Sequence, residues 1–259
     1  MVIKNRLPEL WRLIFFDPAS DSEFRLTEPQ PPSQPPNERI FNAPSVAVLV
    51  ATSILILHQA QDWVEASDPY LIAMFAFQPS SLVRGEAWPG VLTSMFLHAG
   101  WTHAAMNALG AIAFGPPVAR PMKGAAGTLG FLLFYLACGV IATLGYGLLH
   151  LDSDGLLVGA SGAVFGLTGA ALRLLGRRSG LLRPLTDRRF LVPASVLMAV
   201  NALIGVIGLA PGMGSVQVAW EAHAFGFVAG ALLIGPWVGI FGNRAKRFDS
   251  TADLRDGSV

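Results

Sequence analysis

Charged residues are scarce in this sequence: Asp, Glu, Lys and Arg make up 14% of its 259 residues, whereas hydrophobic residues make up 53%. A soluble domain of this length would carry a larger share of charge, about 25%. The mean hydropathy is +0.51, and the apolar residues gather in several runs that reach or approach the ~20 residues needed to cross a bilayer. The composition excludes an ordinary soluble domain and predicts an integral membrane protein that forms one compact bundle.

Cysteine is nearly absent as well. Cys138 is the single cysteine, so an internal disulfide and a thiolate metal cluster are both excluded. Neither the HExxH motif of zinc proteases nor the GxSxG motif of soluble serine hydrolases occurs. His98 lies five residues before His103, a spacing that does not align two metal ligands on one helix. We therefore expect no metal, and the net charge of +1 gives no reason to expect nucleic acid as a partner.

The apolar runs divide the chain into a membrane domain with a tail at each end. Residues 1–43 carry charges and a cluster of prolines, so we expect a tail with a proline-rich linker and no cleaved signal peptide. Residues 44–242 are expected to hold six spans, and residues 243–259 to form a polar tail. The predicted fold class is all-α: a polytopic membrane protein built as a bundle of six transmembrane helices. The approximate spans are 44–59, 100–118, 125–149, 156–175, 190–209 and 218–241, with a long outer loop over 60–90.

The positive residues predict the orientation of these spans. Lys and Arg concentrate in the cytoplasmic loops of membrane proteins. If the N-terminus lies inside, every one of the 18 Lys and Arg residues except Arg84 falls in an inner segment, and acidic residues dominate the outer loops. The sequence therefore predicts that both termini are cytoplasmic, and we expect the membrane to be a bacterial inner (plasma) membrane.

Four polar side chains lie at similar depth near the outer ends of three different spans. His103 and Asn107 are in the second span, Ser161 in the fourth and His223 in the sixth. Polar groups within spans are costly and usually face the bundle interior. A serine and a histidine on neighbouring helices can act as a nucleophile and its base. Acyl transfer also needs donors for an oxyanion, and His103, Asn107 and the Ser161 backbone N–H would supply them.

Small residues recur every three or four positions on the fourth and sixth spans. Such stripes let two membrane helices pack closely, and this packing would bring Ser161 within hydrogen-bond reach of His223. Phe165, one turn after Ser161, would pack under the imidazole and fix its rotamer. The stripe residues are Gly159, Gly162, Gly166 and Gly169 on the fourth span and Ala222, Gly226 and Gly230 on the sixth.

Each of these residues has a simpler interpretation when it is taken alone. A serine between glycines in a membrane helix is most often a packing residue. A lone His223 is more often a structural group, or part of a proton or ion path. The pair His103 and Asn107 could form hydrogen bonds that hold two helices together. A small transporter or channel would place acidic residues inside its spans, and Glu221, at an outer edge, is the only candidate. It is the combination of residues that favours an active site.

Three motifs together carry a resemblance to a known family. They are HAAMN at 103–107, GASG at 159–162 and AHAFGFVAG at 222–230, with the run TSMFLHAGWTHAAMN leading through the second span. In this order and at these spacings, the chain resembles the rhomboid intramembrane serine proteases in their six-span bacterial form over roughly residues 75–240.

The resemblance implies roles for the candidate residues. Ser161 would be the nucleophile and His223 the general base of a dyad with no third acid. His103, Asn107 and the Ser161 amide would form the oxyanion hole. The supporting residues would be Gly159, which helps to shape that hole, Phe165 beneath the histidine, and Gly162 and Gly226 in the two stripes.

One position departs from the family pattern. The outer loop of these proteases commonly carries Trp-Arg, whereas Pro89 follows Trp88 here. That arginine is associated with the shape of a membrane-embedded loop, so its absence leaves the position of the loop open.

The function implied by the resemblance is that of an intramembrane serine endopeptidase without a cofactor. It would cleave single-pass transmembrane proteins near the outer membrane face through an acyl-enzyme. The alternative is a catalytically inactive rhomboid-like protein that binds or chaperones transmembrane clients. Such relatives typically lack the serine or the histidine, and this chain keeps both.

Overall fold

The computed structural model of the chain describes residues 44–174, 182–208 and 218–242, and these are almost entirely helical. No strand occurs within those ranges, and an isolated antiparallel bridge joins Phe77 to Leu157. The long helices are α2 (Ser45–Glu65), α6 (Trp101–Ala119), α7 (Gly124–Leu149), α8 (Ser161–Leu174), α9 (Arg188–Ile207) and α10 (Trp220–Phe241). Short helices fill the connection from α2 to α6, namely α3 (Pro69–Phe75), α4 (Ser81–Arg84), α5 (Gly90–Thr93) and the 3-10 helix η1 (Ser94–Phe96).

Four of the long helices, α2, α7, α9 and α10, are long and apolar enough to cross a membrane. The predicted fold class, an all-α membrane protein with several spans, is confirmed. The two remaining expected spans correspond to α6, with 19 residues, and α8, with 14 residues. The count of six spans therefore stays a prediction, and both expected tails lie outside the described residues.

Two span boundaries predicted from the sequence are wrong, and both lie next to polar residues. The first helix does not end near residue 59 but continues to Glu65, because Gln61 finds partners in the backbone of His98 and Asp62 in the side chain of Trp101, the first residue of α6. The fourth helix begins at Ser161 and not near residue 156. Gly159, which was expected in the helical stripe, therefore lies outside the helix, with a φ of 126°.

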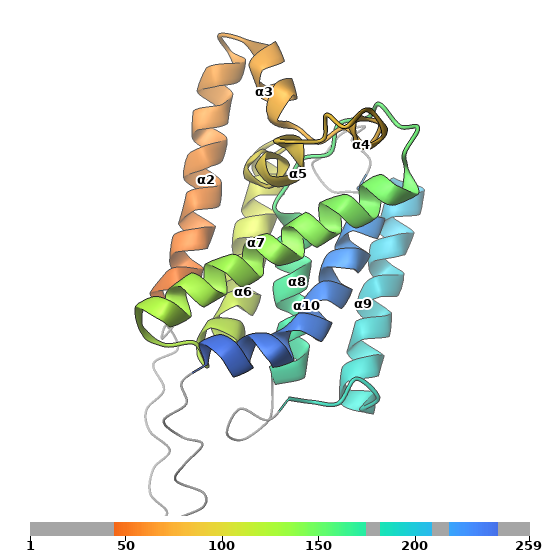
Figure 1. Ribbon diagram of the computed structural model, residues 1–259. Coiled ribbons are helices and arrows are strands. Elements are labelled where there is room, and N and C mark those ends of the chain that lie inside the picture. The colour runs from red at the N-terminus through yellow and green to blue at the C-terminus, as the bar shows by residue number, and fades with distance from the viewer. Residues whose placement is uncertain (1–43, 175–181, 209–217, 243–259) are drawn as a thin grey trace, which may run out of the picture. The chain divides into compact units, whose positions relative to one another are not determined.

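Helix α8 lies in the middle of the bundle and packs against α6, α7 and α10 (Figure 1). The core around it is apolar, and the side chains of Phe131, Phe134 and Leu167 are fully buried there. Helix α9 lies at the edge, where the only buried residues in its range are Phe190, Ala194 and Asn201. Helix α8 is therefore packed against other helices on several sides, whereas α9 is packed on one side only.

Helices α8 and α10 pack backbone to backbone through glycine. A Cβ atom added at Gly226 would collide with the carbonyl group of Gly162, and one added at Gly230 would collide with that of Gly166. In lipid, helices have no hydrophobic drive toward one another, so close van der Waals packing of this kind holds them together. Apart from Gly159, the two predicted stripes of small residues meet as expected.

We expect Gly230→Ala to destabilise the protein, because the added methyl group would force α8 and α10 apart. Overpacking of this kind typically costs about 1–3 kcal/mol, which thermal unfolding in detergent micelles would detect as a lower midpoint. Gly239→Ala on the same helix is the matched control, because nothing lies within 4 Å of its added Cβ atom. A Gly230→Ala variant as stable as the Gly239→Ala variant would contradict the tight crossing.

Candidate active site

The start of α8 and the first turn of α10 bring a serine and a histidine together. Ser161 Oγ lies 2.8 Å from His223 Nε2. The ring of Phe165, one turn along α8, stacks on the imidazole with the ring centroids 4.3 Å apart and 5° between the planes. The stacked ring restricts the imidazole to one plane, in which Nε2 faces the hydroxyl group.

A residue that the sequence analysis missed contacts the other side of His223. Asn201, on α9, places Oδ1 2.7 Å from His223 Nδ1 and donates from Nδ2 to the Trp220 carbonyl at 2.9 Å. The sequence did contain a signal, because Ser195 and Asn201 are the only polar side chains between Phe190 and Ile207. An amide within a span usually finds its partner inside the bundle.

His103 and Asn107 approach the same region from α6. A Cβ atom added at Gly159 would lie 2.6 Å from His103 Cε1 and 2.8 Å from Nε2, so the edge of the ring lies directly against this glycine. The φ of 126° at Gly159 belongs to a region that favours glycine. His103 Nδ1 accepts a long hydrogen bond from the Ala99 N–H at 3.5 Å, which leaves Nε2 as the donor of a neutral ring. Asn107 Nδ2 donates one N–H to the His103 carbonyl at 3.0 Å, and an amide nitrogen has a second N–H to offer.

Backbone hydrogen bonds hold the segment that leads into Ser161. Phe77 and Leu157 exchange two bonds of 3.0 and 2.8 Å, and the Gly159 N–H donates to the Ser94 carbonyl at 2.9 Å. This non-helical stretch is therefore fixed against the connection between α2 and α6. The position of Ser161 follows from that connection as well as from its own helix.

His98 links the same segment to α2. Its Nε2 accepts from the Ala160 N–H at 3.5 Å. The Gln61 side chain accepts from the His98 N–H and donates to the His98 carbonyl, both at 2.8 Å. Burial, followed by the nearby rings of His103 and His58, lowers the pKa of His98 to about 3, so the ring is neutral at pH 7 and can accept. A chain of contacts thus runs from α2 through His98 to the residue before Ser161.

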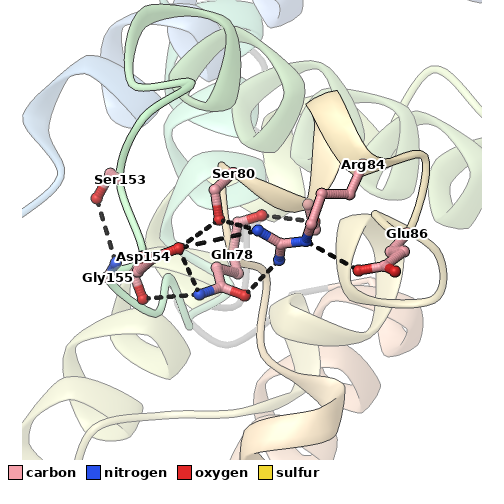
Figure 2. A network of polar contacts seen from close by, with 8 residues as sticks. Gln78, Ser80, Arg84, Glu86, Ser153, Asp154 and Gly155 are labelled. Carbon is pink, nitrogen blue, oxygen red and sulfur yellow. Dashed lines mark hydrogen bonds and ion pairs between the residues drawn. The ribbon is translucent and has the colours of Figure 1, made fainter.

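Arg84 links several exposed residues of the connection between α2 and α6 (Figure 2). Its guanidinium donates to Gln78 Oε1 at 2.9 Å, to Ser80 Oγ at 2.8 Å and to Glu86 at 2.9 Å. Asp154, in the segment before α8, accepts from Ser80 at 2.6 Å and from Gln78 at 3.0 Å. The arginine that the resemblance places later in this loop is absent, and the hydrogen bonds of Arg84 come from an earlier position in the chain.

A cavity of about 490 Å³ lies beside the Ser161–His223 pair. His103, Asn107 and Phe165 line it near that pair, and its apolar walls continue along α6 and α9. These walls suit an apolar segment of polypeptide. Among the described residues, no three His, Cys, Asp or Glu side chains are grouped so that they would hold a metal ion.

The remaining predicted residues, Gly162 and Gly226, lie behind the cavity. They meet each other where α8 crosses α10, so they hold the two helices together and do not line the cavity.

Comparison with known proteins finds similarity to one family. The family model described as a rhomboid domain matches residues 84–238. The Bacillus subtilis (strain 168) protein YdcA, provisionally named as a rhomboid protease, is 32% identical over 155 residues, covering 59% of this chain and 68% of YdcA. Rhomboid protease GluP of the same bacterium is 31% identical over 179 residues, covering 67% of this chain and 31% of GluP. Rhomboid-like protein 11, chloroplastic, of Arabidopsis thaliana is 35% identical over 152 residues, covering 57% of this chain and 52% of that protein.

We expect Gln61→Leu to lower the thermal stability of the protein, because the N–H and carbonyl groups of buried His98 would lose their partner. A buried polar group left unsatisfied costs about 1–3 kcal/mol. Gln59→Leu is the matched control, since Gln59 is half-buried on the same helix and makes no side-chain hydrogen bond within the described residues. Equal unfolding midpoints for the two variants would show that the two hydrogen bonds from Gln61 to the His98 backbone contribute nothing to stability.

Proposed function

The chain belongs to the rhomboid family, and on that premise we propose that it is an intramembrane serine endopeptidase with Ser161 as nucleophile and His223 as general base. Two curated relatives carry the name of rhomboid protease, YdcA provisionally. The observation that carries the proposal is the 2.8 Å hydrogen bond between Ser161 Oγ and His223 Nε2 beside an apolar cavity. A serine in a helix can instead bond to the carbonyl group four residues earlier, whereas the Ser161 hydroxyl group bonds to His223 on another helix.

In the proposed reaction, Ser161 Oγ attacks the carbonyl carbon of the scissile peptide bond while its proton passes to His223 Nε2. The negative charge on the carbonyl oxygen would be stabilised by His103 Nε2–H, Asn107 Nδ2–H and the backbone N–H of Ser161. That backbone N–H has no partner within α8, because it belongs to the first turn. Collapse of the intermediate breaks the C–N bond, and the imidazolium returns its proton to the leaving amine. Water then cleaves the acyl-enzyme, with His223 again as base and without a cofactor.

The proposed substrates are single-pass transmembrane proteins, cut near the outer membrane face. A helix buries its peptide carbonyls in intrahelical hydrogen bonds, so the segment must unwind before Ser161 can attack it. The apolar walls between α6 and α9 are suited to receive such a segment from the bilayer. The partners in this proposal are therefore transmembrane protein substrates and the lipid bilayer.

We propose that residues 44–242 form a six-span catalytic domain and that both tails, residues 1–43 and 243–259, are cytoplasmic. The distribution of Lys and Arg along the chain supports this orientation. In Figure 1, the short helices α3 to α5 lie at the end of the bundle where α6 and α8 begin, which agrees with a site near one membrane face. A bacterial inner (plasma) membrane is the proposed location, and two relatives come from a bacterium, Bacillus subtilis.

We expect Ser161→Ala and His223→Ala each to abolish cleavage of a single-pass reporter by protein reconstituted in lipid, because each removes one end of the proton transfer. Circular dichroism and the unfolding midpoint of each variant would serve as controls for the fold. If the wild type leaves several reporters intact while binding them, the alternative of an inactive, client-binding member would replace the proposal.

We expect His103→Ala and Asn107→Ala to slow cleavage without abolishing it, because each removes one donor to the oxyanion. Loss of one such donor costs roughly 100- to 1,000-fold in kcat in a soluble serine protease. The measurement is kcat and KM with the same reporter. A wild-type rate in either variant would remove that residue from the oxyanion hole.

A further inference from the structure

We propose that Asn201 is a positioning residue that accepts a hydrogen bond from His223 Nδ1–H and thereby keeps Nε2 free to take the proton of Ser161. This inference rests on the proposed function and deepens it. It extends the serine–histidine pair to a chain of three residues from three helices, with Ser161 on α8, His223 on α10 and Asn201 on α9.

The amide of Asn201 has one orientation that satisfies both of its neighbours. The carbonyl oxygen of Trp220 can only accept a hydrogen bond, so the amide nitrogen must face it, at 2.9 Å. The amide oxygen therefore faces His223 Nδ1, at 2.7 Å. The reverse orientation would set two acceptor oxygens against each other.

This orientation determines the tautomer of His223. An amide oxygen cannot donate, so Nδ1 of the imidazole must carry the proton. A neutral imidazole carries one proton, which leaves a lone pair on Nε2, 2.8 Å from Ser161 Oγ. The other tautomer would present an N–H to the hydroxyl group and could not accept its proton.

The composition of α9 sets Asn201 apart. Of the two polar residues in its apolar run, Ser195 is exposed, whereas Asn201 is 6% exposed. A buried amide is costly unless it is hydrogen-bonded, and in a membrane span such a residue usually has a functional partner. Both ends of this amide bond to α10, and one end bonds to the proposed base itself.

During the reaction, Asn201 would act by orientation and not by charge. When the proton of Ser161 reaches Nε2, the imidazolium carries an N–H on each nitrogen. The Nδ1–H bond to the amide oxygen then becomes charge-assisted and stronger. The proton on Nε2 leaves with the amine, and the starting tautomer is restored with the same bond in place.

The first test compares two substitutions at this position. Asn201→Leu removes both polar ends at similar volume and should lower kcat for the reporter at least about 10-fold, as loss of a histidine-orienting partner does elsewhere. KM should change little, because Asn201 is not among the residues that line the cavity. Asn201→Asp keeps an oxygen acceptor for His223 Nδ1–H, and in its protonated form the carboxyl group can still donate to the Trp220 carbonyl. This variant should therefore retain a higher kcat than Asn201→Leu. A wild-type kcat in Asn201→Leu, or equal losses in both variants, would overturn the proposal.

Trp237→Phe is the matched control for stability. Trp237 Nε1 donates to the Gly130 carbonyl at 2.7 Å, so this variant also breaks a hydrogen bond from a side chain to the backbone of another helix. Trp237 lies 14 residues after His223 on α10, which is about 20 Å along a helix. Both variants should unfold at lower temperature, but only Asn201→Leu should lower kcat. An equal fall of kcat in both would show that Asn201 is merely structural.

A second readout needs no turnover. Nitrogen NMR of protein with ¹⁵N-labelled histidine distinguishes the two neutral tautomers, and His223→Ala identifies the signals of His223. The wild type should show a proton on Nδ1, and Asn201→Leu should show a proton on Nε2 in part of the molecules; an unchanged tautomer would overturn the proposal. If the wild type cleaves no reporter but Asn201→Leu shifts the tautomer of His223, the proposed function fails, while the hydrogen bond between Asn201 and His223 is supported. If the wild type cleaves and Asn201→Leu behaves like it, only the inference about Asn201 fails.

Discussion

The close crossing of α8 and α10 is the constraint on which the rest of the structure depends. Glycine on both helices lets backbone meet backbone, at Gly162 with Gly226 and at Gly166 with Gly230. Ser161 begins one of these helices and His223 lies in the first turn of the other. Their hydrogen bond is therefore a result of the helix crossing, and any side chain that separates the helices would also separate the two polar groups.

The second requirement is that polar backbone near the site finds partners within the protein. Outside helices and closed barrels, backbone at membrane depth is tolerated only where protein or a wet cavity satisfies it. The segment before Ser161 meets this requirement through bonds to Phe77, Ser94 and His98, and Gln61 does the same for His98. The non-helical segment before Ser161 thus has hydrogen-bond partners within the protein.

Sequence reasoning was strongest for features with a local cause and weakest for those that depend on a partner. Apolar runs located α6, α7, α9 and α10 to within about two residues, because length and hydropathy decide where a helix can span. The end of α2 was misplaced because charged and amide side chains end its apolar run, while contacts with His98 and with the start of α6 continue the helix.

Small and polar residues show the same difference between local features, which the sequence predicts, and distant contacts, which it does not. The stripe of small residues was visible in spacing, but spacing does not reveal that Gly159 has a positive φ and lies outside the helix. Gln61 and Asn201 were overlooked because an amide in a sequence does not reveal what it bonds to. Their partners, the backbone of His98 and the ring of His223, lie 37 and 22 residues away along the chain.

Asn201 lies on the helix that the bundle holds least. Phe190, Ala194 and Asn201 are the buried residues of α9, so in a membrane most of its surface would face lipid acyl chains. A spanning helix adjusts its tilt when the thickness of the bilayer changes, at a cost of fractions of a kcal/mol per Å. If Asn201 orients the base, tilting α9 moves the acceptor away from His223 Nδ1. The thickness of the surrounding bilayer would then act on the protonation of the proposed base through a helix that carries neither Ser161 nor His223.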